Sequence, residues 1–163
     1  MDSSIELIVT VFPDPAQAGQ VMEQVHALEK EGNLKLFSSA WISKDQAGNA
    51  SVKEGRDLDP RRGALFGALV GGLMGLLAGP AGMVIGAAAG AATGSAAAGR
   101  IDLGFENKFL SEVQETLKPG TSALLLMLEN PYGATAAQKL EELGGKVFRH
   151  ALRDDLAKRL SEE

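Results

Sequence analysis

The sequence contains no cysteine, few aromatic residues and no concentrated block of basic residues. The absence of cysteine excludes disulfide bonds, thiol catalysis and cysteine metal sites. The net charge is −5, and the basic residues are interspersed with acidic ones. Because phosphate binding requires a concentrated basic patch, we expect no nucleic-acid partner. A length of 163 residues is typical of one domain, here with an insertion.

Residues that commonly perform catalysis are also scarce. The two histidines, His26 and His150, lie far apart in the sequence, and no acid, histidine and nucleophile stand together locally. Neither of the glycine motifs that cradle phosphate groups is present. We therefore expect no catalytic residue, no metal ligand and no cofactor site, and a protein that is not an enzyme.

The amino-terminal residues lack the basic region and the following apolar region of a secretory signal. The absence of cysteine is compatible with a reducing compartment. We expect a cytoplasmic protein, with the cytoplasmic face of the membrane as an alternative location.

What the chain does contain is a glycine-rich segment between Arg62 and Arg100 that holds no charged residue. Most of its glycines recur every fourth residue, in two runs separated by Pro80. A loop would not keep this period, whereas a helix places residues at that spacing on one face. The segment 61–100 therefore predicts a glycine-zipper helical hairpin, whose two stripes are Gly63, Gly67, Gly71, Gly75 and Gly79, then Gly82, Gly86, Gly90 and Gly94.

Stripes of glycine let two helices approach closely, and they predict that the chain forms homo-oligomers through this hairpin. Each glycine in a helix costs about 1 kcal/mol relative to alanine, so its repeated use favours a packing role. Each arm has about 16 residues, or roughly 24 Å, whereas a bilayer core is about 30 Å thick. Two surroundings for the hairpin thus stay open, a lipid membrane and a protein core.

Charged residues flank the hairpin at both ends. Arg61 and Arg62 precede it, and Arg100 and Asp102 follow it. If the hairpin enters a membrane, basic flanks favour a cytoplasmic location for both ends. Alternatively, these charges form ion pairs with one another and with neighbouring acids at the base of the hairpin.

The rest of the chain predicts an α+β head formed by residues 1–60 and 101–163. Residues 5–12 and 34–43 have the pattern of strands, 50–53 that of a short edge strand, and 121–129 that of a central strand covered on both faces. Asp14 is predicted to cap a helix that Gly32 ends, and Gly144 and Gly145 end a later one. A helix carrying Phe109 and Val113 and a last strand at 146–152 complete a ferredoxin-like sandwich.

Three stretches of the sequence resemble a known family. They are Ile101-Asp102-Leu103-Gly104-Phe105, Leu117-Lys118-Pro119-Gly120-Thr121-Ser122-Ala123-Leu124 and Gly144-Gly145-Lys146-Val147-Phe148-Arg149. With the glycine hairpin, they resemble the bacterial family called domain of unknown function 1269, whose members are often labelled membrane proteins. The resemblance covers nearly the whole chain and implies no catalytic residues.

Two functions follow as expectations. The first is a structural or interaction protein that homo-oligomerises through the hairpin, either at a membrane or as a large self-assembly. The alternative is a soluble regulatory module whose head binds a small ligand while the hairpin only joins subunits. A convergent polar pocket in the head would favour the second function.

Overall fold

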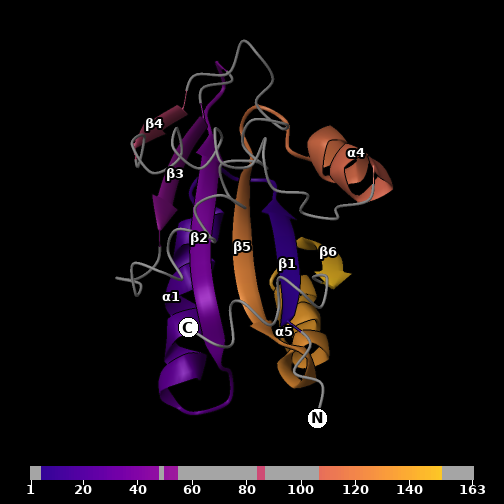
Figure 1. The fold of residues 1–163 in the computed structure, drawn as a ribbon. Helices are drawn as coiled ribbons and strands as arrows, with labels where there is room; N and C mark the ends of the chain where they lie inside the picture. The colour runs from indigo at the N-terminus through magenta and orange to yellow at the C-terminus, as the bar shows by residue number, and fades with distance from the viewer. Residues whose placement is uncertain (1–4, 48–49, 55–83, 87–106, 152–163) are drawn as a thin grey trace.

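The computed structural model describes residues 5–47, 50–54, 84–86 and 107–151, which form an α+β fold (Figure 1). The predicted fold class is therefore confirmed. In chain order the elements are β1 (Ile5–Phe12), α1 (Gln17–Lys30), β2 (Leu36–Lys44), β3 (Ala50–Glu54), β4 (Val84–Gly86), α4 (Asn107–Thr116), β5 (Ser122–Glu129), α5 (Asn130–Glu142) and β6 (Lys146–Ala151).

The strands form one sheet in the order β4-β3-β2-β5-β1-β6. Strands β2, β5, β1 and β6 are antiparallel to their neighbours. The chain runs β1-α1-β2 and later β5-α5-β6, and β5 lies between β1 and β2. The two strand–helix–strand units therefore interleave within one sheet.

Strand β4 corrects the prediction for the second glycine run. Val84–Gly86 was expected within a helix, but it forms a strand parallel to β3, with Ile85 opposite Ser51. Val84 and Ile85 are β-branched and favour extended backbone, and their pairing satisfies backbone groups on the outer side of β3. The helix prediction is therefore wrong at Gly86, and β3 is not the edge strand among the described elements.

The other residues of the predicted hairpin lie outside the described part of the chain. These are Gly63, Gly67, Gly71, Gly75, Gly79, Gly82, Gly90 and Gly94, together with the flanking charges Arg61, Arg62, Arg100 and Asp102.

The centre of the sheet is buried on both faces. Every residue of β1 is buried, and so is every residue of β5 except Glu129 at its end. Successive side chains of a strand point to opposite faces, so complete burial requires cover on each side. The prediction of a doubly covered strand at residues 121–129 is confirmed.

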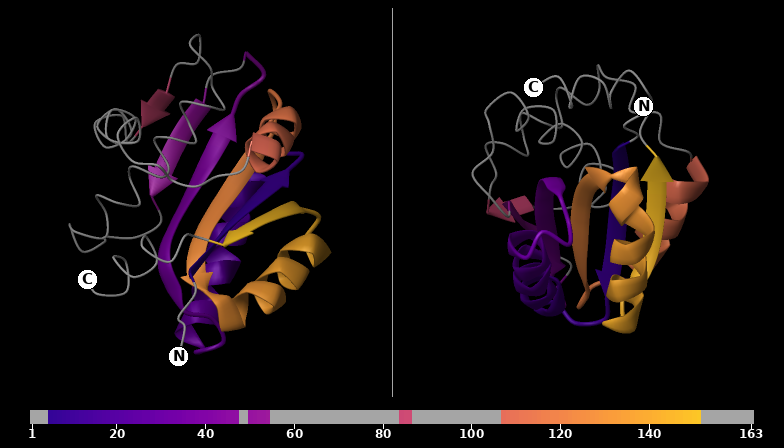
Figure 2. Two further views of the ribbon diagram at one scale, coloured as in Figure 1. Left: turned by 45° about the vertical axis from the view of Figure 1, so that its right-hand side comes forward. Right: turned by 90° about the horizontal axis from the view of Figure 1, so that it is seen from below.

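Helices α1 and α5 lie side by side on one face of the sheet (Figure 2). Helix α1 packs on β2 and β5, and α5 packs on β1 and β6. The apolar core beneath them includes Ile8 and Phe12 from β1, Met22 from α1, Leu126 from β5 and Leu140 from α5. These residues are all at most 2 % exposed.

Helix α4 packs against β1 and β6 on the opposite face of the sheet. The Phe109 ring lies 5.2 Å from the His150 ring, and His150 is paired in register with Leu7. Leu7 alternates with Ile8 along β1, so it points away from α1 and α5. Val113 and Leu117 are buried, which confirms the predicted apolar side of this helix.

Both sheet-covering helices end in the same backbone motif. After α1, the N–H groups of Gly32 and Asn33 donate to the carbonyl groups of Glu29 and Leu28. After α5, Gly144 and Gly145 donate in the same pattern. Gly32 and Gly144 have φ values of +80° and +93°, which glycine adopts without strain. The predicted helix ends are confirmed.

The start of α1 differs from the prediction. Asp14 Oδ1 accepts a hydrogen bond from the Ala16 N–H at 2.7 Å, and α1 begins only at Gln17. The side chain of Asp14 therefore stabilises the turn before the helix and does not cap the helix itself.

Candidate functional site

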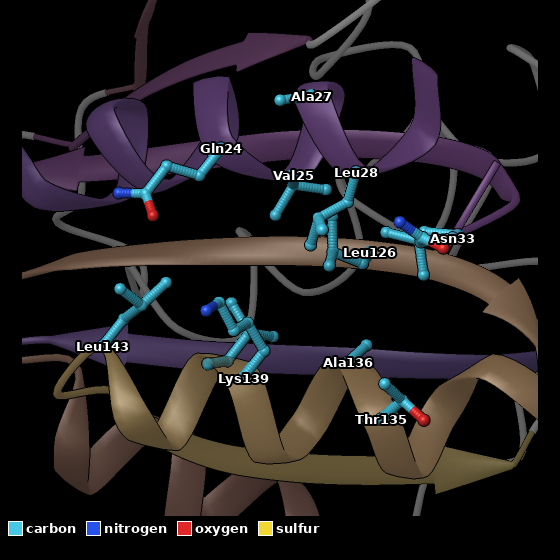
Figure 3. A pocket seen from close by; sticks show the side chains of 12 residues that line it. Gln24, Val25, Ala27, Leu28, Asn33, Leu126, Thr135, Ala136, Lys139 and Leu143 are labelled. Carbon is cyan, nitrogen blue, oxygen red and sulfur yellow. The ribbon is translucent and has the colours of Figure 1, made fainter. Parts of the chain in front are cut away.

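A cleft lies between α1 and α5, above β5, and it is the candidate binding site of the described residues (Figure 3). Its volume is about 400 Å³. Helix α1 packs mainly on β2 and β5 and α5 mainly on β1 and β6, while both helices also contact β1 and β5. At one end, Gln17 Nε2 donates a hydrogen bond of 3.0 Å to the Leu143 carbonyl oxygen and joins the start of α1 to the end of α5.

The walls and floor of the cleft are apolar. Leu126 of β5 forms the floor and is completely buried. The sides come from both helices and from the segment after α1; these residues are Val25, Ala27, Leu28, Leu34, Ala136, Leu140 and Leu143. Two of the side residues are alanines, which leave space where larger side chains would bring the helices into contact.

Four polar side chains complete the lining. Gln24 and Asn33 come from α1 and the turn after it, and Thr135 and Lys139 come from α5. Figure 3 shows the Lys139 side chain extending into the gap between the helices, whereas Asn33 and Thr135 lie toward the end opposite Leu143. An apolar cleft with a few polar groups is the usual composition of a small-molecule site.

Lys139 is the only ionisable residue in the lining. Close to the cleft, Asn33 Nδ2 donates to Glu31 Oε2 at 3.2 Å, and on α5 Gln138 Nε2 donates to Glu142 Oε1 at 3.4 Å. The side chain of Lys139 has no ion pair among the residues that the structure describes. Lys139 therefore gives the lining one positive charge, and the Glu31 carboxylate lies beside the lining residue Asn33.

On the far side of α5 lies an ion pair between a buried carboxylate and a partly exposed guanidinium group. Arg149 of β6 donates from Nε to Glu6 Oε1 at 2.6 Å and from Nη2 to Oε2 at 2.9 Å. The Glu6 side chain is only 8 % exposed. The hydrogen bond from Arg149 to Glu6 raises the pKa of Arg149, so the guanidinium stays charged over the whole range of ordinary pH. Both carboxylate oxygens are engaged, which makes this pair structural.

The two histidines do not share a site. His26 is half-buried on α1, and its Nε2 atom is buried without a hydrogen-bond partner among the described residues. His150 lies on β6, on the face that α4 covers. In the described ranges 5–47, 50–54, 84–86 and 107–151, no group of three acidic, histidine or cysteine side chains could hold a metal ion.

Sequence reasoning did not find the cleft. The lining residues come from three separate parts of the chain, at 24–34, 126 and 135–143. The one available signal was the pair Ala27 and Ala136, since alanine on facing helices leaves room, but no pattern in the sequence pairs these two positions.

The fold and the cleft define the protein as an α+β protein with a mainly antiparallel sheet and a small-molecule-sized apolar cleft between the two helices on one face. Residues 64–163 match the family described as "Protein of unknown function (DUF1269)", and the chain belongs to this family. The resemblance seen in the sequence is therefore confirmed. No curated protein and no solved structure matches the chain. Among the described residues, none of the helices is long and apolar enough to cross a membrane.

Proposed function

We propose that this chain is a non-enzymatic structural or interaction protein that homo-oligomerises through its glycine-rich segment, residues 61–100. The head is proposed to be a ferredoxin-like sandwich, which the interleaved β1-α1-β2 and β5-α5-β6 units support. In the chain the segment lies between β3 and α4, and its strand β4 pairs with β3 at the end of the sheet. An insertion at this place leaves the head's strand order intact.

The observation that carries the proposal is the four-residue period of glycine in the first run, from Gly63 to Gly79. Two straight helices that cross at about 40° stay in contact for only a few turns. One such contact therefore needs fewer than the five glycine positions present here. The run therefore supports contact with a second copy of the chain. Strand β4 interrupts the second run at Gly86, so the proposal rests on the first.

The test replaces two glycines of the first run with leucine, as Gly67→Leu together with Gly71→Leu. We expect the particle mass measured by light scattering to fall, because leucine side chains hold the helices apart. Ala64→Leu with Ala68→Leu is the matched control, since it adds the same two side chains one position off the stripe. An unchanged mass in the glycine variant, or an equal fall in the control, would contradict the proposal.

The surroundings of the glycine-rich segment are tested separately by flotation of the untagged protein in a density gradient without detergent. Protein that rises with lipid would identify a membrane-associated oligomer with the head on the cytoplasmic side, as the basic flanks Arg61, Arg62 and Arg100 favour. Protein that stays at the bottom as one high-mass species would identify a self-assembly whose glycine stripes contact only protein.

A second function has a specific observation in its favour. In this alternative the head is a regulatory module that binds a small ligand, and the glycine-rich segment only joins subunits. The cleft of about 400 Å³ between α1 and α5 lies within the roughly 300–1,000 Å³ typical of small-molecule sites. The lining is mainly apolar above a buried apolar core, so the convergent polar pocket that would favour this function is not found among the described residues.

A further inference from the structure

We propose that the cleft between α1 and α5 binds a free medium-chain fatty acid, with the apolar chain over Leu126 and the carboxylate at Lys139. This inference deepens the second function above, the ligand-binding module. It does not depend on oligomerisation through residues 61–100, so the two proposals can fail independently.

The apolar lining selects for a hydrocarbon chain. The floor at Leu126 is completely buried, and Leu140 on the α5 side is 2 % exposed. Water in contact with such a lining cannot make its usual hydrogen bonds, so its displacement by methylene groups is favourable. A volume of about 400 Å³ stands near the lower end of the usual range for ligand sites, which favours a medium chain over a long one.

The charge of the lining selects for an anion. Lys139 is the one ionisable residue there, and its ammonium group has no ion pair among the described residues. No carboxylate belongs to the lining, so a bound carboxylate meets no like charge within the cleft. A cationic amphiphile would instead be repelled by Lys139. A neutral alcohol would leave the ammonium group of Lys139 without a charged partner.

Polar side chains line both ends of the cleft. The hydrogen bond from Gln17 to Leu143 joins the helices at one end. Gln24 lies toward that end, Asn33 and Thr135 lie toward the other, and Lys139 stands between the helices (Figure 3). Lys139 is the only charged group among these side chains, so the carboxylate of the ligand is assigned to it.

The experiment is calorimetric titration of the full-length protein with decanoate and with decanol, both below the concentration at which they aggregate. We expect saturable binding of decanoate at one site per chain. Decanol is expected to bind about fivefold more weakly, which is the contribution of a partly exposed ion pair.

Two variants test the assigned residues. Lys139→Gln is expected to weaken decanoate binding about fivefold and to leave decanol binding unchanged, whereas Lys108→Gln, on exposed α4 surface, changes neither. Ala27→Trp places an indole ring in the cleft and is expected to abolish binding of both ligands. Its control is Ala134→Trp, because Ala134 is exposed on α5 and does not line the cleft.

The proposal is overturned if neither ligand shows saturable binding, or if decanoate binding survives Ala27→Trp. Equal affinities for decanoate and decanol, or an unchanged decanoate affinity in Lys139→Gln, would overturn the assignment of an anionic ligand. The decanoate titration is repeated with Gly67→Leu/Gly71→Leu. If this variant binds decanoate but has a reduced particle mass, binding does not depend on oligomerisation. If it keeps its mass but neither it nor the unaltered protein binds decanoate, only the binding proposal fails.

Discussion

The two sides of α5 differ in how closely they fit their neighbours. Toward β6, a methyl group at Gly133 would stand 2.7 Å from Glu6 Oε1 and 3.0 Å from Arg149 Nη2, so only glycine fits without movement. Toward α1, the same helix leaves a cleft of about 400 Å³. One helix on one sheet therefore shows both arrangements.

This difference explains which positions should tolerate change. Protein interiors are close-packed, and voids larger than a water molecule are few. The cleft is instead open at its rim, where Gln24, Thr135 and Lys139 are exposed. The predictions below compare the closely packed side, toward β1 and β6, with the open side, toward α1.

The largest effect is expected from Arg149→Leu. The variant leaves the Glu6 carboxylate at 8 % exposure without its guanidinium partner, and we expect the free energy of unfolding to fall by about 3 kcal/mol. The measurement is the urea midpoint of the full chain. Lys118→Leu, at an exposed position, should change it by less than about 0.5 kcal/mol. Equal midpoints for the two variants would show that the ion pair contributes nothing.

A smaller loss, about 2 kcal/mol, is expected from Gly145→Ala. The added methyl group would overlap the Thr10 methyl group and stand 2.8 Å from the Phe12 ring, and both residues are completely buried. Gly32→Ala is the comparison, since it meets no atom within 4 Å and carries only the strain of its positive φ, about 1 kcal/mol. A larger loss in Gly32→Ala by thermal unfolding would contradict close packing next to β1.

Gly133→Ala should cost about 1 kcal/mol. The methyl group displaces the Glu6 carboxylate from its position beside Arg149, but alanine favours the helix by about 1 kcal/mol, so part of the loss is offset. The loss of unfolding free energy that Gly133→Ala causes is measured twice, once in the unaltered protein and once in the Arg149→Leu variant. A loss that persists after the ion pair has been removed would show that the contact with the pair is not its cause.

The smallest effect is expected on the open side. Ala27→Leu adds apolar volume to the cleft at an exposed position, and the unfolding free energy should change by less than about 0.5 kcal/mol. Hydrogen exchange of α1 amides provides the second measurement and should show no loss of protection. A destabilisation as large as that of Gly145→Ala would mean that no room exists between the helices.

Most of the described secondary structure could be predicted from the sequence because its determinants are local. Alternating apolar residues at 5–12 predicted β1, and the run of apolar residues within 121–129 predicted the doubly buried β5. Gly32 and Gly144 predicted helix ends because a positive φ is easiest for glycine. These features depend on residues within a few positions of one another.

The errors arose where a local pattern competed with a distant partner. The glycine period predicted a helix through Gly86, but Val84 and Ile85 pair with β3, about thirty residues earlier in the chain. Asp14 has the residue type of a helix cap, yet its carboxylate accepts the Ala16 N–H, and its carbonyl oxygen accepts the Ser122 hydroxyl at 2.6 Å. The pairing of Val84 with β3 and the contact of Asp14 with Ser122 cannot be identified from the neighbouring residues.

The sequence by itself determined the fold class, the main strands and helix ends, and the family to which the chain belongs. Only the tertiary structure decided that Glu6 meets Arg149 beneath Gly133, and that Ala27 and Lys139 face one cleft. The physical reason is that helix and strand periodicity acts over a few residues. The distance between α1 and α5 is instead set by the strands on which each helix packs, and these come together only when the whole sheet forms.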